Sequence, residues 1–175
     1  MHLSIWVPDR TDASRISRTE IRITEVAGRG HPGLDAECIH MERGEMQKSR
    51  LRRTTDRGTD VGLDLPAGTT LHDGDLVRGE GRTVIVRQMP ETVGVISPAG
   101  GPVPAEMWML AAHAIGNMHR PISISRDEIM FPVQDASERE TFACMLDRAG
   151  TGRFEITVRE AVFEPHAAAN VAGHG

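Results

Sequence analysis

The chain of 175 residues has very few aromatic side chains: Phe and Trp together make up 3% of it, and tyrosine is absent. Its hydrophobic fraction of 39% is low for one thick core and favours small cores supported by a dimer interface. Long apolar runs are also missing, so no segment is expected to span a membrane. The composition therefore predicts a soluble protein made of small domains.

Cysteine and excess positive charge are scarce as well. The only cysteines, Cys38 and Cys144, lie far apart and outside any CxxC spacing, which suits a reducing compartment. The N-terminus reaches Asp9 and Arg10 too early for a secretory signal, so a cytoplasmic location is expected. The formal net charge of -5 argues against general nucleic-acid binding, and the basic run 48–53 is interpreted as a solvated surface.

Motifs of the common enzyme classes do not occur. The sequence has no GxSxG, P-loop, HExxH or Gly-rich dinucleotide fingerprint. Acidic pairs such as Asp73 and Asp75 stand among glycines and are interpreted as turn residues. Cys144 adjoins Met145 and Leu146 in a predicted amphipathic helix, where we expect an inert, buried thiol. The sequence thus predicts a protein that is not an enzyme.

Short strands and turns are predicted for the first half of the chain. Residues 20–26 alternate polar and apolar side chains, and residues 83–87 form a β-branched run, as half-buried strands do. Glycines punctuate the interval between them, and no convincing helix precedes residue 104. We therefore predict an antiparallel β domain over residues 1–89.

Strands and helices alternate in the second half. The predicted segments are strands at 92–96, 121–125, 128–132 and 154–159 and helices at about 104–115 and from Ser137 to Gly150. The order β-α-β-β-α-β predicts a ferredoxin-like domain over residues 90–163, so the expected fold class is α+β. Residues 164–175 have little to bury and are predicted to form a flexible, His-containing tail.

The two predicted helices should each bury one face. The expected apolar stripe of the first helix is Met107, Leu110, Ala111 and Ala114. Phe142, Met145 and Leu146 supply the expected buried face of the second helix, and Ser137 with Glu140 is typical of a capping box at its start.

One histidine stands at a predicted corner of the chain. Gly116 and Asn117 tolerate the left-handed turn that ends a helix, and Pro121 forbids a helix after it. His119 should therefore point away from its own core, which suits a metal ligand. Because one imidazole cannot hold a metal ion tightly, a twofold dimer with two copies of His119 across its axis would solve the problem.

The segment around His119 also resembles a known signature. Ala-Ile-Gly-Asn-Met-His-Arg-Pro-Ile-Ser-Ile at 114–124 is similar to Leu-Gly-Asn-Arg-His-x-Pro-Leu-Gln-Ile of UreE, the urease accessory protein that carries nickel. Residues 50–75 resemble the basic, Asp- and Gly-punctuated block of that family's N-terminal domain, and Phe163-Glu164-Pro165 is a third match. The three matches follow the family's order, whereas residues 1 to about 40 match only loosely.

The resemblance implies a nickel metallochaperone that delivers Ni(II) to the urease apoprotein together with other urease accessory proteins. It implies that the β domain engages partner proteins and that the second domain forms a homodimer with His119 of both protomers at the interface. His166 and His174 in the tail are candidate further ligands, with exposed surface histidines as the equal alternative. The family often has longer His-rich tails and a His motif where this chain has residues 131–138, so one or two ions per dimer are expected rather than bulk storage.

Other functions stay open beside this one. A metal-independent adaptor of the urease assembly complex is motivated by the short tail and the missing histidines. A Zn(II)- or Cu(II)-handling protein of the same fold is also possible from sequence, because imidazoles accept those ions. His113 lies about 240° around a helix from His119 and is expected to pack or hydrogen-bond near the site rather than to ligate. The histidines interpreted as ordinary exposed side chains are His2, His31, His40 and His72.

Overall fold

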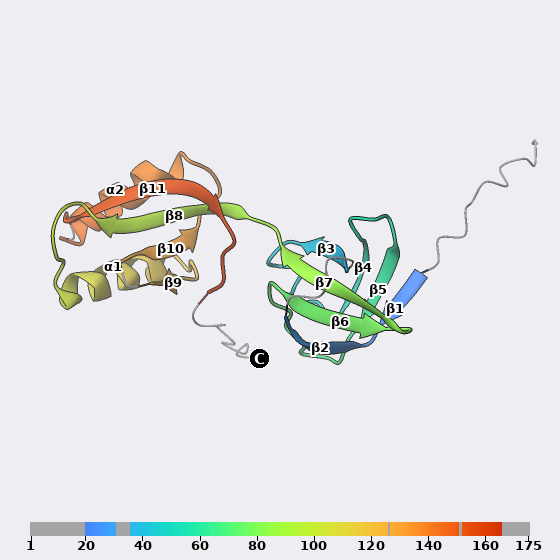
Figure 1. Cartoon of the computed structure of the whole chain (residues 1–175). Helices are drawn as coiled ribbons and strands as arrows, with labels where there is room; N and C mark the ends of the chain where they lie inside the picture. The colour runs from blue at the N-terminus through green and yellow to red at the C-terminus, as the bar shows by residue number, and fades with distance from the viewer. Residues whose placement is uncertain (1–19, 31–35, 126, 151, 166–175) are drawn as a thin grey trace, which may run out of the picture. The chain divides into compact units, whose positions relative to one another are not determined.

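The computed structural model describes residues 20–30, 36–125, 127–150 and 152–165. The described chain has a mixed α+β structure, mostly β-sheet with two helices, which confirms the predicted class (Figure 1). It divides into two compact units, with unit 1 ending at Arg87 and unit 2 beginning at Gln88. No helix in the described ranges combines the length and the apolar character that crossing a bilayer requires.

Unit 1 is built from short strands. Its described strands are β1 (Glu20–Ile23), β2 (Glu25–Arg29), β3 (Glu37–Met41), β4 (Arg50–Thr54), β5 (Asp60–Asp64), β6 (Asp75–Gly79) and β7 (Arg82–Gln88). They form a three-stranded sheet in the order β1-β5-β4 and a four-stranded sheet in the order β2-β6-β7-β3. The pairs β4–β5, β2–β6 and β6–β7 are antiparallel, but β1 pairs with β5 in parallel. The predicted antiparallel β domain is therefore corrected to a mixed one.

The parallel pair arises where the predicted strand over 20–26 is divided at Thr24. Before Thr24, Ile21 and Ile23 are buried in the core, whereas the side chains of β2 after it are exposed. β1 passes so close to β6 that a Cβ at Gly79 would overlap the carbonyl oxygen of Arg22. The chain thus leaves one sheet and enters the other within one residue, which the alternation of side chains alone does not reveal.

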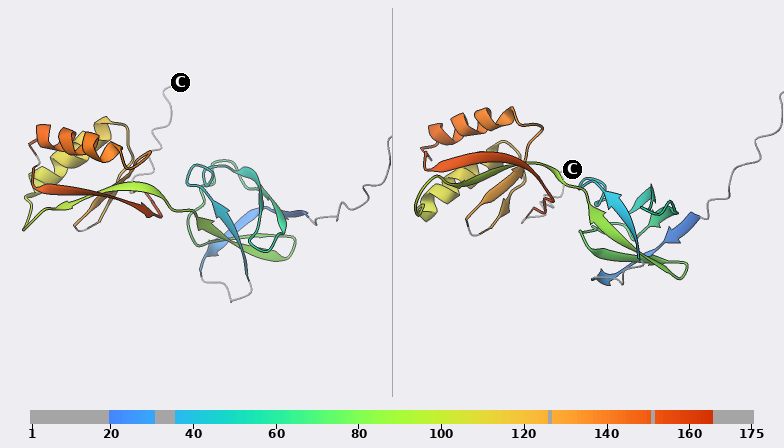
Figure 2. Two further views of the ribbon diagram at one scale, coloured as in Figure 1. Left: turned by 90° about the horizontal axis from the view of Figure 1, so that it is seen from above. Right: turned by 45° about the horizontal axis from the view of Figure 1, so that its top comes forward.

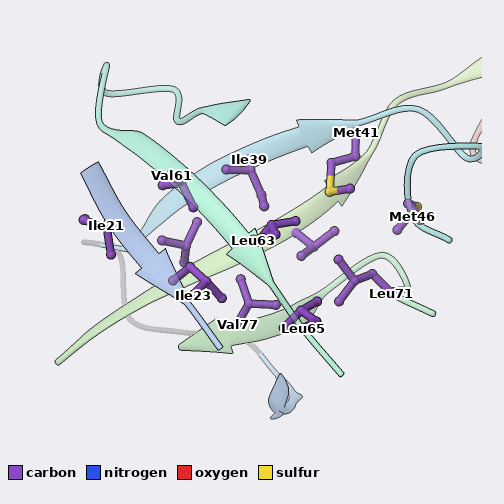
Figure 3. Packing of buried hydrophobic residues seen from close by; sticks show 12 residues of the cluster. Ile21, Ile23, Ile39, Met41, Met46, Val61, Leu63, Leu65, Leu71 and Val77 are labelled. Atoms are coloured by element: carbon purple, nitrogen blue, oxygen red, sulfur yellow. The ribbon is translucent and has the colours of Figure 1, made fainter. Parts of the chain in front are cut away.

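The interior of unit 1 is aliphatic. Figure 3 shows buried side chains from the two sheets meeting in one cluster. Its members are Ile21, Ile23, Ile39, Met41, Met46, Val61, Leu63, Leu65, Leu71, Val77, Val84 and Val86. None of these side chains is aromatic, so the core depends on branched residues and methionine, each contributing about 1.5–3 kcal/mol when fully buried.

Charged side chains on the outer face of unit 1 are paired in a way that favours ionised carboxylates. Arg22 and Arg50 both donate to the carboxylate of Asp64, and the Arg22 bond is the main cause that lowers the pKa of Asp64. The hydroxyl of Thr55 donates to Glu37 at 2.6 Å and lowers the pKa of that carboxyl. Both groups therefore hold protons less readily in the folded chain than in the unfolded chain.

We expect unit 1 to lose stability in acid for this reason. A carboxylate with a lowered folded pKa stabilises the fold above its unfolded pKa of about 4 and loses that contribution as pH falls through the folded value. Asp64→Asn should therefore be destabilising at about pH 7, and its deficit relative to wild type should shrink toward about pH 3. Urea unfolding followed by amide NMR signals of β4 and β5 measures the deficit. Asp147→Asn, an exposed carboxylate of unit 2, is the control, and a deficit that stays constant with pH would contradict the assignment.

Unit 2 combines a sheet with both helices. Its elements are β8 (Glu91–Pro98), α1 (Ala105–Asn117), β9 (Ser123–Ile124), β10 (Ile129–Pro132), α2 (Glu138–Arg148) and β11 (Phe154–Ala161). The sheet has the strand order β11-β8-β10-β9, and each neighbouring pair is antiparallel. Both helices cover one face of it (Figure 2). β9 is shorter than the predicted strand 121–125, because only Ser123 and Ile124 pair with β10.

The core beneath the helices sets the rotation of α1. Its buried members are Ile96, Ala111, Ile115, Ile129, Phe131, Val133, Phe142, Leu146 and Ile156. The Trp108 ring lies against Phe154 with the ring centroids 4.6 Å apart, so the buried side of α1 runs through Trp108, Ala111 and Ile115. The predicted stripe is therefore wrong at Leu110, which is exposed.

The second helix buries Phe142 and Leu146 as predicted, but two other expectations for it are wrong. Ser137 makes no side-chain cap; its backbone N–H and its hydroxyl both donate to the carboxylate of Asp135 and lower the pKa of that group. Cys144 is exposed rather than buried. Two residues correspond to about 200° around a helix, so Cys144 points away from the side that holds Phe142 and Leu146.

The other face of the unit 2 sheet is covered by the segment after β11. Phe163 is fully buried there against Val93 and Val95. Its carbonyl oxygen accepts a hydrogen bond of 2.8 Å from the side-chain amide of Gln88. The predicted tail therefore begins next to an anchored aromatic ring.

Candidate metal centre

His119 lies at the corner where α1 ends and the chain turns toward β9. The backbone N–H of Met118 donates to Ile115 at 3.0 Å, and that of His119 donates to Gly116 at 2.9 Å. His119 itself adopts the left-handed conformation, with φ of 56°, and its side chain is exposed. The imidazole is therefore presented away from the core, at the end of a helix whose last turn is buried through Ile115.

The residues that make this corner differ from those predicted. Gly116 and Asn117 are still helical, so the expectation that they form the left-handed turn is wrong. Pro121 disfavours the helical region for Arg120, and the left-handed residue of the corner is His119. A left-handed conformation costs an L-residue roughly 1–2 kcal/mol, although histidine tolerates it better than most residues do. An exposed histidine held in this conformation is a candidate functional residue.

The residue after His119 is tied to the second helix. Arg120 donates from Nη2 to Oε1 of Glu138 at 2.8 Å, and the other oxygen of Glu138 accepts from the backbone N–H of Gln134 at 2.9 Å. Sequence reasoning missed this pair, because the two partners lie 18 residues apart and no local pattern links them.

His113 faces solvent one turn before the end of α1. Its Nε2 lies 3.1 Å from the side-chain amide nitrogen of Asn117, two residues before His119. The exposure of His113 contradicts the expected packing role. Its contact with Asn117 agrees with the other expectation, a hydrogen bond near the corner.

The remaining predicted ligands cannot be placed around His119. His166 and His174 lie outside the described residues. Within the described ranges, no group of three or more His, Cys, Asp and Glu side chains is arranged to hold a metal ion. A metal centre at His119 therefore requires a second copy of the chain or residues beyond those ranges.

An apolar depression lies along the same helix, and sequence reasoning missed it. It has a volume of about 200 Å³ and is lined by Trp108, Met109, Ala112, Ile124, Ser125 and Ile129, a group we call the α1–β9 surface. Met109 is 63% exposed and Ile124 is 44% exposed. Large apolar side chains gathered in water are typical of interaction surfaces, so this surface is a candidate for one.

These features define a two-unit α+β protein whose exposed corner histidine is suited to binding a metal ion. Comparisons with known proteins show which family it is similar to. Residues 23–88 match the model of the UreE urease accessory protein N-terminal domain. The chain is thus similar to the UreE urease accessory proteins, in agreement with the resemblance drawn from its sequence.

Individual relatives extend the match beyond unit 1. The chain is 38% identical over 128 residues to the urease accessory protein UreE of Burkholderia ambifaria, an alignment that covers 73% of this chain and 57% of the relative. It is 36% identical over 132 residues to UreE of Cupriavidus pinatubonensis, covering 75% and 54%. It is 34% identical over 128 residues to UreE of Ralstonia nicotianae, covering 73% and 55%. The chain thus spans little more than half the length of these relatives.

Proposed function

We propose that this chain is a nickel metallochaperone that delivers Ni(II) to the urease apoprotein in the cytoplasm and catalyses no reaction itself. The observation that carries the proposal is His119, an exposed imidazole held in a left-handed corner at the end of α1. The similarity to urease accessory proteins supports urease as the protein that receives the metal.

The ligand set is completed by a second copy of the chain. One imidazole is too little for tight binding, whereas a twofold axis beside His119 brings two imidazoles to one ion. His166 and His174 are the proposed further ligands of each protomer. Ligands that come from outside the corner can leave the ion while His119 keeps it, and such exchange is what delivery to another protein requires.

The α1–β9 surface is the proposed interface of the homodimer. Met109 on α1 and Ile124 on β9 leave apolar area in water, and Met118 beside His119 is exposed as well. A twofold interface uses the same patch of both copies, so burying it would bring the two corners toward one axis. The dimer and the metal site would then depend on the same helix.

The two units have separate proposed roles. Residues 1–89 are the partner-binding domain, which engages urease and the other urease accessory proteins. Residues 90–163 are the metal-binding and dimerisation domain, and residues 164–175 are the tail. We infer a ferredoxin-like fold for the second domain, supported by its order of elements and by the strand order β11-β8-β10-β9.

A metal-independent adaptor is the second candidate. The observation that favours it is that the sequence has no histidine between His119 and His166. An adaptor would bind the urease apoprotein equally well with and without nickel, and it would tolerate replacement of His119. Zn(II) or Cu(II) handling is the third candidate, because an imidazole site binds copper more tightly than nickel.

Calorimetric titration with Ni(II), Zn(II) and Cu(II) at about pH 7 and about pH 5 tests the proposal. Histidine side chains lose their metal-binding lone pair on protonation near pH 6.5, so the nickel affinity should fall between the two conditions by roughly tenfold per pH unit for each ligating histidine. Glu140→Gln, an exposed carboxylate on α2, is a control that should keep the same pH dependence. A nickel affinity that does not change with pH would contradict an imidazole site.

A further inference from the structure

The ion pair that follows His119 is shielded from solvent. The side chains of Arg120 and Glu138 are only 23% and 24% exposed, and their closest atoms lie 2.8 Å apart. Ion pairs in full contact with water contribute little, but a shielded pair is screened less and holds its geometry better. Glu138 has little freedom of its own, because its second oxygen is bonded to the backbone of Gln134. Arg120 is therefore attached to a fixed acceptor at the start of α2.

The backbone at His119 needs an attachment of this kind. A non-glycine residue stays in the left-handed region only when its surroundings determine it from both sides. On the N-terminal side, the N–H of His119 is held by Gly116 in the last turn of α1. On the C-terminal side, the next residue is Arg120 with its ion pair, followed by Pro121 with its fixed φ.

We propose that Arg120, through Glu138, is a positioning residue for the metal-binding imidazole of His119. The inference rests on the proposed nickel-binding role of His119. Arg120 holds the backbone of the corner, so that the imidazole is presented in one direction before the ion arrives. Binding then requires less ordering of the chain, and a twofold site gains this advantage at both of its corners.

The pairing also removes a conflict of charge. An uncompensated guanidinium next to a ligand of Ni(II) would repel the ion, and Glu138 neutralises it. Removing the charge of Glu138 leaves Arg120 both loose and uncompensated, whereas removing Arg120 only loosens the corner. Glu138→Gln should therefore weaken nickel binding at least as much as Arg120→Gln does.

The test is a competition titration of the full-length chain with Ni(II). Loss of a group that orients a metal ligand typically lowers affinity about 10- to 100-fold, and we expect about a tenfold loss in Arg120→Gln and in Glu138→Gln. Arg120→Lys keeps the positive charge on a shorter side chain, so it should lose less nickel affinity than Arg120→Gln does. Arg159→Gln breaks the 3.0 Å ion pair with Glu128 in the same unit and is the matched control, which should bind nickel like wild type.

The outcomes separate this inference from the proposed function. Wild-type affinity in Arg120→Gln and Glu138→Gln, together with lost binding in His119→Ala, overturns the positioning role and leaves the nickel site standing. Wild-type affinity in His119→Ala overturns both. A lower melting temperature with unchanged nickel affinity shows a purely structural ion pair and also overturns the inference. If Arg120→Gln does not fold, Glu138→Gln decides by the same criteria.

Discussion

Replacing His119 by alanine should lower the nickel affinity of the chain at least about 100-fold and leave the fold and the dimer intact. Metal affinity comes from several ligands gathered at one place, and in a twofold site one substitution removes two imidazoles at once. The side chain is exposed and contributes nothing to the core of unit 2, so stability should fall by no more than about 1–2 kcal/mol, the cost of alanine in the left-handed conformation. Calorimetric titration measures the affinity, and light scattering follows the mass of the dimer.

Two further variants make this experiment specific. His119→Asn keeps a residue that tolerates the left-handed conformation and removes the imidazole, so its loss of affinity should match that of alanine. His113→Ala removes an exposed imidazole from α1, the helix that precedes His119. Its nickel affinity should stay within about threefold of that of wild type. Equal nickel affinity in wild type and in both His119 variants would assign the metal to other residues and contradict the proposed site.

Replacing Phe163 by alanine should destabilise unit 2 by about 3 kcal/mol or more. The ring is fully buried against Val93 and Val95, so its removal leaves a cavity and exposes both valines to water. The hydrogen bond from Gln88 to the Phe163 carbonyl does not depend on the ring, and it opposes collapse of the segment into the cavity. Phe163 also lies three residues before His166, so its ring sets the point from which the tail starts.

The fluorescence of Trp108 reports the unfolding of unit 2, because the ring contacts Phe154 within that unit. Trp6 is the only other tryptophan, so Trp6→Phe gives a background in which fluorescence follows unit 2 alone. Urea unfolding of Phe163→Ala on that background should show the full loss, and Val162→Ala, at a 42% exposed position, should change stability by less than about 0.5 kcal/mol. A Phe163→Ala curve that coincides with the control would show that the ring is not an anchor.

Local patterns predicted much of this structure. Glycine-punctuated β-branched runs indicated a β-rich first unit, and apolar spacing located the two helices and the buried pair Phe142 and Leu146. Gly116, Asn117 and Pro121 indicated a corner at His119, and the structure places an exposed histidine there. These features are determined by residues that are close together along the chain, so the sequence alone can reveal them.

The remaining features depend on distant partners. The contact between Trp108 and Phe154 set the rotation of α1 and left Leu110 exposed, which helical spacing could not decide. The parallel pairing of β1 with β5 follows from the change of sheet at Thr24. The bond between Arg120 and Glu138 joins two elements that no local signal connects. Each of these contacts forms only when the units fold, and one of them adjoins the candidate metal ligand.

The most direct test of the shared nickel site is native mass spectrometry of the full-length chain titrated with Ni(II). We predict that wild type appears as two chains carrying nickel and that single chains carry none. His119→Asn should keep the species of two chains and lose the nickel. Nickel carried equally by single chains, or retained by the His119→Asn dimer, would contradict a site built from two copies of His119.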